Sequence, residues 1–327
     1  MRALLVLISA AALGGCDTLA YYGQAASGQL AIVRAARPVA DVLADPATGA
    51  ALRAQLLQAQ AIREFAIREL SLPDDGSYRA YADLHRAFVV WNVVATPEFS
   101  LAPVLSCFPV AGCVAYRGYF ARADAEAYAA GLRAAGDDVL VYGVPAYSTL
   151  GWFDDPLLST FIGDGEASLA RLIFHELAHH VVYVKDDSTF NESFAVTVER
   201  EGLKRWRAAR GEPAPDASRR EAFAALVAST RATLEALYRT KVSPDEMRRR
   251  KREALAPLAP WLARIPGFEG AEPSNAVLAS FATYTQQVPM FEKLLAEEHG
   301  SLPAFYARVK RLASERSTPD PSPAPRP

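Results

Sequence analysis

Hydrophobic positions change their spacing along this chain, and each change predicts a different kind of element. Residues 24–36 and 49–70 are rich in Ala, Leu, Gln and Arg, which is typical of helices, with a break near Pro46. An alanine-rich helix is also expected at 122–135. Short runs of β-branched and aromatic residues on either side of it predict a small mixed sheet, with strands at 87–95, 113–120 and 139–144.

The second half of the chain is predicted to be helical. Residues 167–184 are apolar on most sides, which indicates a buried central helix. Long helices are expected at 217–241 and 244–264, and two or three more at 275–315. The whole pattern therefore predicts an α+β fold that is predominantly helical, with a small mixed β-sheet and one buried helix.

The buried helix carries the string HELAHH at 175–180. His175 and His179 are four residues apart, so they share a helix face about 6 Å apart along the axis and can bind one ion. Glu176 points about 100° away, which suits a general base for a water molecule rather than a metal ligand. Unpaired imidazoles and a carboxylate are costly in a buried helix, which favours a bound metal or a dedicated polar network. His180 is offset by about 100° from His179, so it is expected to orient another group or face solvent.

A catalytic zinc site needs a third protein ligand, and the string NESFA at 191–195 offers Glu192. This glutamate opens the next predicted helix, after a polar turn at 185–189. With Thr189 it also matches a capping box, in which it would only satisfy backbone donors. Glu199, seven residues later, is a fallback ligand or a group that orients a histidine. The pattern predicts one Zn²⁺ per chain, with these ligands: His175, His179 and Glu192.

The beginning of the chain has the shape of a signal peptide. Arg2 precedes an apolar run at 3–13, which is too short to span a bilayer and ends in the sequence LGGC at 13–16. This ending resembles a bacterial lipobox, which implies a signal peptide at 1–15 and a lipidated tether at 16–23 that begins at Cys16. An ordinary signal peptide with an incidental Cys16 is the alternative. The lipobox implies a membrane-anchored lipoprotein of the cell envelope whose soluble body faces the periplasm.

Cys107 and Cys113 form the remaining cysteine pair. In an oxidising periplasm they are expected to form a disulfide that closes a seven-residue loop, worth about 2 kcal/mol in the chain-entropy description. A two-cysteine metal site is the alternative, but no other ligand cluster lies near them in the sequence. A Cys–His nucleophilic enzyme is disfavoured, because a sulfur in a disulfide cannot attack.

The charge of the chain and its last residues add two limits. The formal net charge of −2 gives no electrostatic reason to expect nucleic acid. The basic run at 248–252 is flanked by acidic residues, which favours a solvated helix face over contact with anionic lipid headgroups. The tail at 316–327 holds five prolines and is expected to be disordered.

Several strings together resemble a known family over residues 16–315: LGGC, CFPVAGCVAYRGYF, VPAYSTLGWFDDPLLSTF, HELAHH and NESFAVTVE. They are similar to a bacterial family of aminopeptidase lipoproteins, and NESFA after HELAH resembles the NExxA signature of gluzincin aminopeptidases. The resemblance implies a zincin-like zinc metallopeptidase that hydrolyses peptides in the cell envelope. The pattern along the chain divides a single predicted domain at 24–315 into a helical arm at 24–72, a sheet region at 78–145, metal-site helices at 165–208 and C-terminal helices at 217–315.

Two departures from the better-known aminopeptidases leave the mode of cleavage open. The spacer between His179 and Glu192 is shorter than theirs, and no counterpart of their GxMEN segment, which holds the substrate's amine, is found. Asp154, Asp155 and Glu166 are candidates for that role by sequence proximity, but the first two also suit a turn and Glu166 suits a first helical turn. A metalloendopeptidase and a non-catalytic, zinc-stabilised envelope lipoprotein therefore stay as alternatives.

Hydrolysis also benefits from a donor aimed at the developing oxyanion. Tyr147, Tyr183 and Tyr284 are the candidates, although Tyr183 lies about 12 Å along the helix axis from His175. Tyr284 is preferred as a catalytic residue, since it lies on a later helix that is expected to close over the cleft, as tyrosines do in related zincins. The aromatic segment at 146–161 is a candidate wall of this cleft, and core packing of Trp152 and Phe153 explains it equally well.

Overall fold

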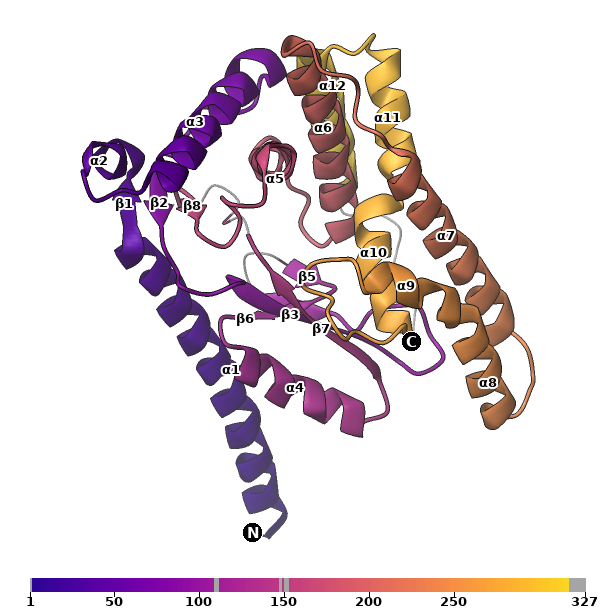
Figure 1. Cartoon of the computed structure of the whole chain (residues 1–327). Helices are drawn as coiled ribbons and strands as arrows, with labels where there is room; N and C mark the ends of the chain where they lie inside the picture. Colours follow the sequence, from indigo (N-terminus) through magenta and orange to yellow (C-terminus); the bar gives the residue numbers. More distant parts are fainter. Residues whose placement is uncertain (1, 109–111, 147–148, 150–152, 318–327) are drawn as a thin grey trace.

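The computed structural model describes residues 2–108, 112–146, 149 and 153–317. It confirms the predicted class, because the chain is α+β and mostly helical with small sheets (Figure 1). The predicted tail falls largely outside these residues, and its first two positions belong to the last helix. Within the described residues, no helix has both the length and the apolar character needed to cross a bilayer.

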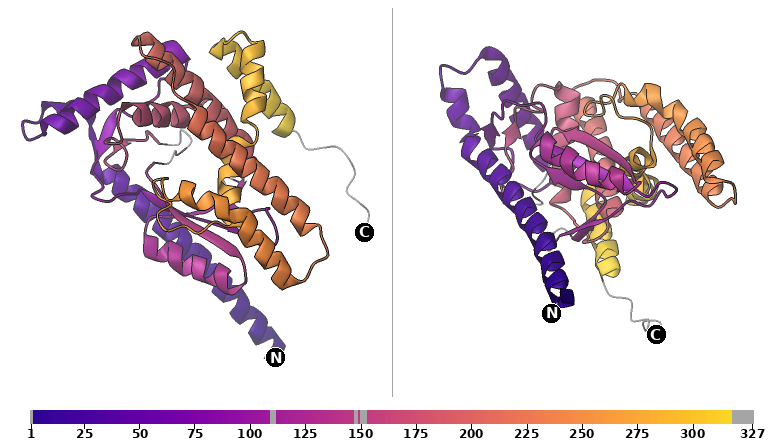
Figure 2. Two further views of the ribbon diagram at one scale, coloured as in Figure 1. Left: turned by 45° about the vertical axis from the view of Figure 1, so that its right-hand side comes forward. Right: turned by 90° about the horizontal axis from the view of Figure 1, so that it is seen from below.

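The N-terminal part forms a long helix and an arm. Residues predicted as a tether, 16–23, are helical and continue into the helix predicted at 24–36. Figure 2 shows this first helix running along one side of the body, with its N-terminal end projecting beyond it. The elements are α1 (Arg2–Ala35), β1 (Ala36–Pro38), α2 (Val39–Ala44) and α3 (Ala50–Leu70).

In the part of the chain that the structure describes, the sheet region and the neighbouring strands β1 and β8 (Leu157–Leu158) form three small sheets rather than one. The elements that follow α3 are β2 (Ala80–Ala82), β3 (Val90–Thr96), β4 (Ser106–Phe108), β5 (Gly112–Val114), β6 (Arg117–Tyr119), α4 (Arg122–Ala134), β7 (Asp138–Val144) and β8. The central sheet has the order β6-β3-β7 and is antiparallel, whereas β2 pairs antiparallel with β1 and parallel with β8. The predicted mixed pairing therefore occurs only in the sheet of β1, β2 and β8 among the strands described.

The strand predicted at 113–120 is wrong as a single element. Its first part, β5, pairs with β4, whereas its second part, β6, pairs with β3 in the central sheet. A disulfide between Cys107 and Cys113 ties β4 to β5, with 3.9 Å between the two Cα atoms. The run therefore bends between two sheets, and the predicted disulfide is confirmed.

The faces of β3 alternate between two surroundings, as the pleat of a strand requires. Val93 packs with Ala125 and Ala129 of α4 on one face. Val94 on the other face belongs to a core formed with the C-terminal helices, and Val90 and Asn92 on that face line a cavity. Helix α4 therefore covers one face of the central sheet (Figure 1). The cavity lies on the other face.

The remaining chain is helical, and two predicted elements differ from those observed. The predicted helix at 167–184 ends at His179, and the one at 244–264 divides into three short helices. At Pro257 and Pro260 the backbone lacks the N–H that a continuous helix needs. The elements are α5 (Glu166–His179), α6 (Ser188–Ala209), α7 (Ser218–Tyr238), α8 (Pro244–Leu255), η1 (Ala256–Leu258), α9 (Ala259–Leu262), α10 (Asn275–Thr285), α11 (Val288–Glu297) and α12 (Leu302–Ser317).

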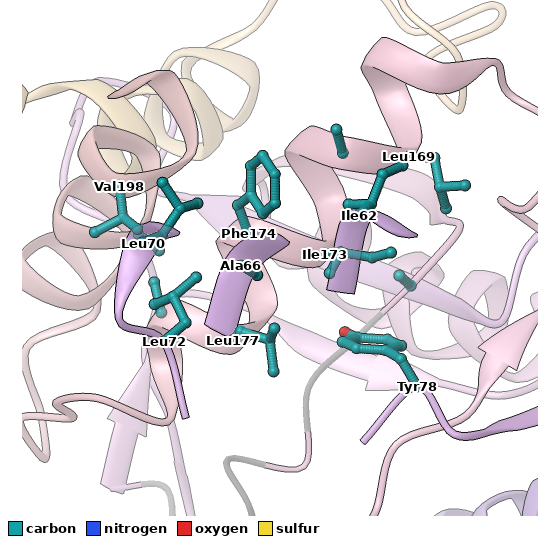
Figure 3. Packing of buried hydrophobic residues seen from close by; sticks show 14 of the residues in the cluster. Ile62, Ala66, Leu70, Leu72, Tyr78, Leu169, Ile173, Phe174, Leu177 and Val198 are labelled. Atoms are coloured by element: carbon teal, nitrogen blue, oxygen red, sulfur yellow. The ribbon is translucent and has the colours of Figure 1, made fainter. Parts of the chain in front are cut away.

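Helix α5 lies in the centre of the main hydrophobic core, as its apolar pattern predicts. Ile173, Phe174 and Leu177 are fully buried against α3 and α6, and Figure 3 shows this packing. Gly202 of α6 allows the close approach, because a Cβ atom there would lie 2.7 Å from the Phe174 ring. Helix α5 is therefore held rigidly on two sides, and its polar residues face the remaining side.

Candidate active site

The turn between α5 and α6 sets the position of Glu192. The side chain of Asn191 accepts a hydrogen bond from Val184 N and donates one to Val184 O, both at 2.8 Å. Asp187 is the N-cap of α6 and accepts from Phe190 N at 2.9 Å. Because Asp187 caps the helix, Glu192 lies beyond the capping position, and the capping-box interpretation of Thr189 and Glu192 is wrong.

The structure brings His175, His179 and Glu192 together. Glu192 Oε2 lies 3.2 Å from His175 Nε2 and 3.6 Å from His179 Nε2. The two Nε2 atoms are 3.3 Å apart, and no other group of three His, Cys, Asp or Glu residues with this proximity occurs in the part of the chain that the structure describes. These three side chains can hold a metal ion.

The same three groups shift each other's protonation. Burial by itself would raise the pKa of Glu192, but the two imidazoles beside it hold that pKa well below its usual range. Burial by itself would lower the pKa of His175, but its hydrogen bonds to Glu192 and Glu199 raise it well above the ordinary value. The cluster is therefore a concentrated negative site that favours a cation, either a proton or a metal.

Glu176 lines the cavity that faces the central sheet, together with His175, His179 and Glu192. Burial raises the pKa of its carboxyl above the ordinary value, and the neighbouring imidazoles offset part of this effect. A carboxylate with a raised pKa accepts a proton more readily near neutral pH. The structure therefore places beside the three-residue cluster a group suited to act as a base.

Glu199 and His180, which the sequence also singled out, take different positions. Glu199 Oε2 lies 3.3 Å from His175 Nδ1, on the opposite side of the ring from Glu192, so of its two predicted roles the geometry matches orientation. His180 points away from the cluster and pairs with Asp75, with 2.6 Å between Nδ1 and Oδ2.

Tyrosines surround the cluster. The Tyr284 ring lies 6.3 Å from the His175 ring, and the negative charge of Glu192 together with burial raises its pKa well above 10. Tyr183 lines the same cavity, and Tyr147 lies outside the described residues. Sequence reasoning missed Tyr116, which also lines the cavity and whose pKa is raised by burial and by Glu192. Its only sequence signal is its place in the string CVAYRGYF.

None of the three candidate carboxylates for a substrate amine is among the described residues that line the cavity, although Asp155 lies close enough to Glu176 for that carboxylate to raise its pKa. Glu166 accepts hydrogen bonds from Gln58 and Trp206 at the far end of α5. Asp155 is buried and accepts from the backbone and hydroxyl of Thr149, while Asp154 lies against Gly76. In the aromatic segment before α5, Trp152 is outside the described residues and Phe153 is exposed.

A cavity of about 380 Å³ lies in front of the cluster. Helices α5, α6 and α10, the central sheet, β4, β5 and the inner face of α1 all contribute to its wall. Polar groups gather near the cluster, and apolar or aromatic side chains form the rest of the wall. The described lining residues are Tyr21, Ala25, Val90, Asn92, Phe108, Val114, Tyr116, Gly118, Phe120, Val144, Ala146, His175, Glu176, His179, Tyr183, Ser188, Asn191, Glu192 and Tyr284.

One family model matches the chain. Residues 20–320 match the model of a family described as "Putative aminopeptidase". Because this match covers most of the 327 residues, the chain belongs to that family, which suggests peptidase activity. No curated protein and no solved structure matches the chain.

Proposed function

We propose that the protein is a zinc metallopeptidase that hydrolyses peptides with a single zinc ion held by His175, His179 and Glu192. The distances among the three donors support this proposal. Ligands placed about 2.0–2.1 Å from a tetrahedral zinc ion are about 3.3–3.4 Å from each other. The three donor pairs lie 3.2, 3.3 and 3.6 Å apart, so the residues fit a tetrahedral ion with one corner left for solvent.

The site residues divide the chemistry among themselves. A bound zinc ion polarises a carbonyl group and lowers the pKa of a water molecule to near 7. Glu176 accepts the proton of the attacking water and later donates it to the leaving amine. Tyr284 donates a hydrogen bond to the oxyanion that develops on the carbonyl oxygen. Glu199 accepts from Nδ1–H of His175, which keeps the lone pair of Nε2 directed at the cluster.

The decisive experiment is the substitution Glu176→Gln. The variant should keep about one zinc per chain, because Glu176 is not a ligand, yet lose peptide hydrolysis by a factor of about 100 or more. Glu253→Gln, at an exposed position of α8, is the matched control and should hydrolyse peptides like the wild type. Unchanged turnover in the Glu176→Gln variant would remove the mechanism.

Metal removal distinguishes the enzyme from a zinc-stabilised, non-catalytic lipoprotein. Because α5 is held in the core by Ile173, Phe174 and Leu177, removal of zinc from an enzyme should abolish activity while the far-ultraviolet circular dichroism stays largely intact. A protein whose helices unfold on chelation, and which cleaves no peptide when loaded, would support the non-catalytic alternative.

An endopeptidase is a second candidate that the cavity wall favours. Among the described lining residues, the acidic ones are Glu176 and Glu192, and both already serve the cluster. The internal residues outside the description, 109–111, 147–148 and 150–152, contain no Asp or Glu. A substrate ammonium group therefore meets no additional carboxylate there. Cleavage of the same peptides with free and with acetylated amino termini tests this. Equal rates support an endopeptidase, whereas failure to cleave the acetylated peptides supports an aminopeptidase.

We also propose that the protein is anchored through a lipid on Cys16, with its body facing the periplasm. The sequence LGGC supports this, and residues 18–33 contain no charged side chain. Leu19, Tyr22, Leu30 and Val33 of this segment are large apolar side chains exposed on α1. A Cys16→Ser variant, produced in cells, should leave the detergent phase after phase separation, whereas Cys107→Ser should remain in it. Equal partition of Cys16→Ser and the wild type would contradict the anchor.

A further inference from the structure

The wall of the cavity includes part of helix α1, which is far from α5 and α6 in the sequence. Tyr21 and Ala25 of α1 line the cavity together with His175 and Glu192. These two positions are four residues apart and thus share one helix face. The N-terminal helix therefore contributes directly to the space in front of the cluster.

Specific contacts fix α1 in this position. Gln24 Nε2 donates to Gly118 O at 3.4 Å, and Gln24 Oε1 accepts from Phe120 N at 3.1 Å. Gly28 lies so close to Phe120 that a Cβ atom there would be 2.1 Å from the ring. Helix α1 is thus packed against the central sheet, and its inner face forms one wall of the cavity.

Aromatic contacts extend this wall. The Tyr21 ring stacks on Phe108 of β4, with ring centroids 5.5 Å apart and an interplanar angle of 25°. The guanidinium of Arg117 lies 4.1 Å from the centroid of the Tyr21 ring. Arg117 is on β6, and the next residue of this strand, Gly118, lines the cavity. Phe108 is held by the adjacent disulfide at Cys107.

This part of the cavity wall is mostly apolar. Its described lining residues are Tyr21, Ala25, Val90, Phe108, Val114, Phe120, Val144 and Ala146, together with Gly118 and the polar Asn92. An apolar wall gains free energy only when an apolar group displaces its water, so it discriminates against charged and small polar side chains. The small side chain at position 25 leaves room between α1 and the sheet that a larger one would fill.

We infer that the α1-walled part of the cavity is a subsite for a bulky apolar side chain of the peptide, adjacent to the bond that is cleaved, and that Ala25 sets its size. This inference rests on the proposed peptidase activity and adds the substrate class. The part of helix α1 that follows the proposed lipid anchor at Cys16 thereby also determines the substrate specificity of the cavity.

The test compares Ala25→Leu with Ala26→Leu, because Ala26 is the next residue and is exposed on the outer face of α1. The substrates are two pairs of alanine pentapeptides. One pair is blocked at the amino terminus and differs only in the central residue, phenylalanine or alanine, and the other pair has a free amino terminus and differs in the same way in the first residue. The wild type should prefer phenylalanine. Ala25→Leu should lower the ratio of kcat/KM for the two peptides of a cleaved pair about tenfold or more, while Ala26→Leu leaves the ratio unchanged.

Equal ratios in the wild type and Ala25→Leu would overturn the subsite. Thermal unfolding checks that both variants fold; if Ala25→Leu does not, the smaller Ala25→Val should lower the ratio by a lesser factor, and no change would overturn the inference.

A binding measurement separates this inference from the proposed function. In the zinc-loaded Glu176→Gln background, calorimetry measures the Kd of the phenylalanine pentapeptides without cleavage. Adding Ala25→Leu should weaken binding about tenfold, and adding Ala26→Leu should not. If the wild type cleaves neither the blocked peptides nor those with a free amino terminus but this difference appears, the peptidase proposal fails and the subsite stands. If cleavage occurs but neither binding nor the kcat/KM ratio responds to Ala25→Leu, the subsite fails and the peptidase stands.

Discussion

Glu199 holds the imidazole of His175 from the side opposite Glu192, with 3.3 Å between Oε2 and Nδ1. On the other side of the ring, Nε2 lies 3.2 Å from Glu192. The ring is thus fixed by two carboxylates from the same helix, α6, seven residues apart. A ring held in this way cannot rotate Nε2 out of the cluster without losing a charged contact.

The substitution Glu199→Gln should therefore weaken zinc binding about 10- to 100-fold, because the orienting contact loses its charge. Competition with a fluorescent chelator measures the affinity. Glu201→Gln is the matched control on α6, since Glu201 pairs with Arg205 and Lys204 instead. Equal zinc affinity in the Glu199→Gln variant and the wild type would show that Glu199 does not orient the ligand.

Removal of the Tyr284 hydroxyl tests the oxyanion donor. Tyr284→Phe should lower kcat about 100-fold with little change in KM or in zinc content, because the hydroxyl acts only as charge develops. Tyr116→Phe is the informative comparison, since Tyr116 lines the same cavity. A large loss of kcat in Tyr116→Phe, with none in Tyr284→Phe, would assign the donor to Tyr116.

Asp155 predicts a pH dependence of stability outside the metal cluster. Burial raises the pKa of this carboxyl to about 6, although hydrogen bonds from Thr149 oppose the change. A folded-state pKa above the unfolded value stabilises the protein at pH below about 4, and this contribution is lost as the pH rises through about 6. The loss from this group amounts to about 3 kcal/mol of unfolding free energy.

The Asp155→Asn variant should not lose this unfolding free energy, because the asparagine side chain does not ionise. The difference in unfolding free energy between the variant and the wild type should therefore shift in favour of the variant by about 3 kcal/mol between pH 4 and pH 7. Urea unfolding of both proteins in the same metal state measures it at each pH. Parallel stability profiles would mean that Asp155 is ionised at the same pH in the folded and unfolded chains.

The disulfide between Cys107 and Cys113 should stabilise the protein modestly. It closes a short loop, with a sequence separation of 6, and its removal in a Cys107→Ser, Cys113→Ser variant should cost about 2 kcal/mol of unfolding free energy. Denaturant unfolding with and without a thiol reductant measures this cost. The reductant should destabilise only the wild type, and an equal effect on both proteins would point to a cause other than this bond.

The central elements of the site follow from local sequence patterns. The four-residue spacing of His175 and His179 on an apolar helix is sufficient to predict α5, its burial and the position of both rings on one face. The seven-residue spacing of Glu192 and Glu199 predicted that both would lie on the same face of α6. Arg249 and Arg250 pair with Glu246 on the exposed face of α8, as the charge pattern of that run indicates.

Features that depend on contacts between distant residues could not be predicted. Asp187, and not Thr189, is the N-cap of α6, because the turn that Asn191 closes starts the helix earlier than the capping-box pattern of Thr189 and Glu192 predicts. The position of Tyr116 depends on how the strand region bends between two sheets, which its β-branched and aromatic composition does not reveal. The partner of His180, Asp75, is 105 residues away.

The pairing of Gln24 with β6 also protects the molecule from self-association. Strand β6 is at the border of its sheet, and the Gln24 amide occupies backbone groups of Gly118 and Phe120 that another chain could otherwise use. A proteolytic fragment that lacks the first 35 residues would expose this border together with the apolar surface beneath it. Such a fragment would be prone to intermolecular strand addition, so the N-terminal helix also acts as a safeguard against aggregation.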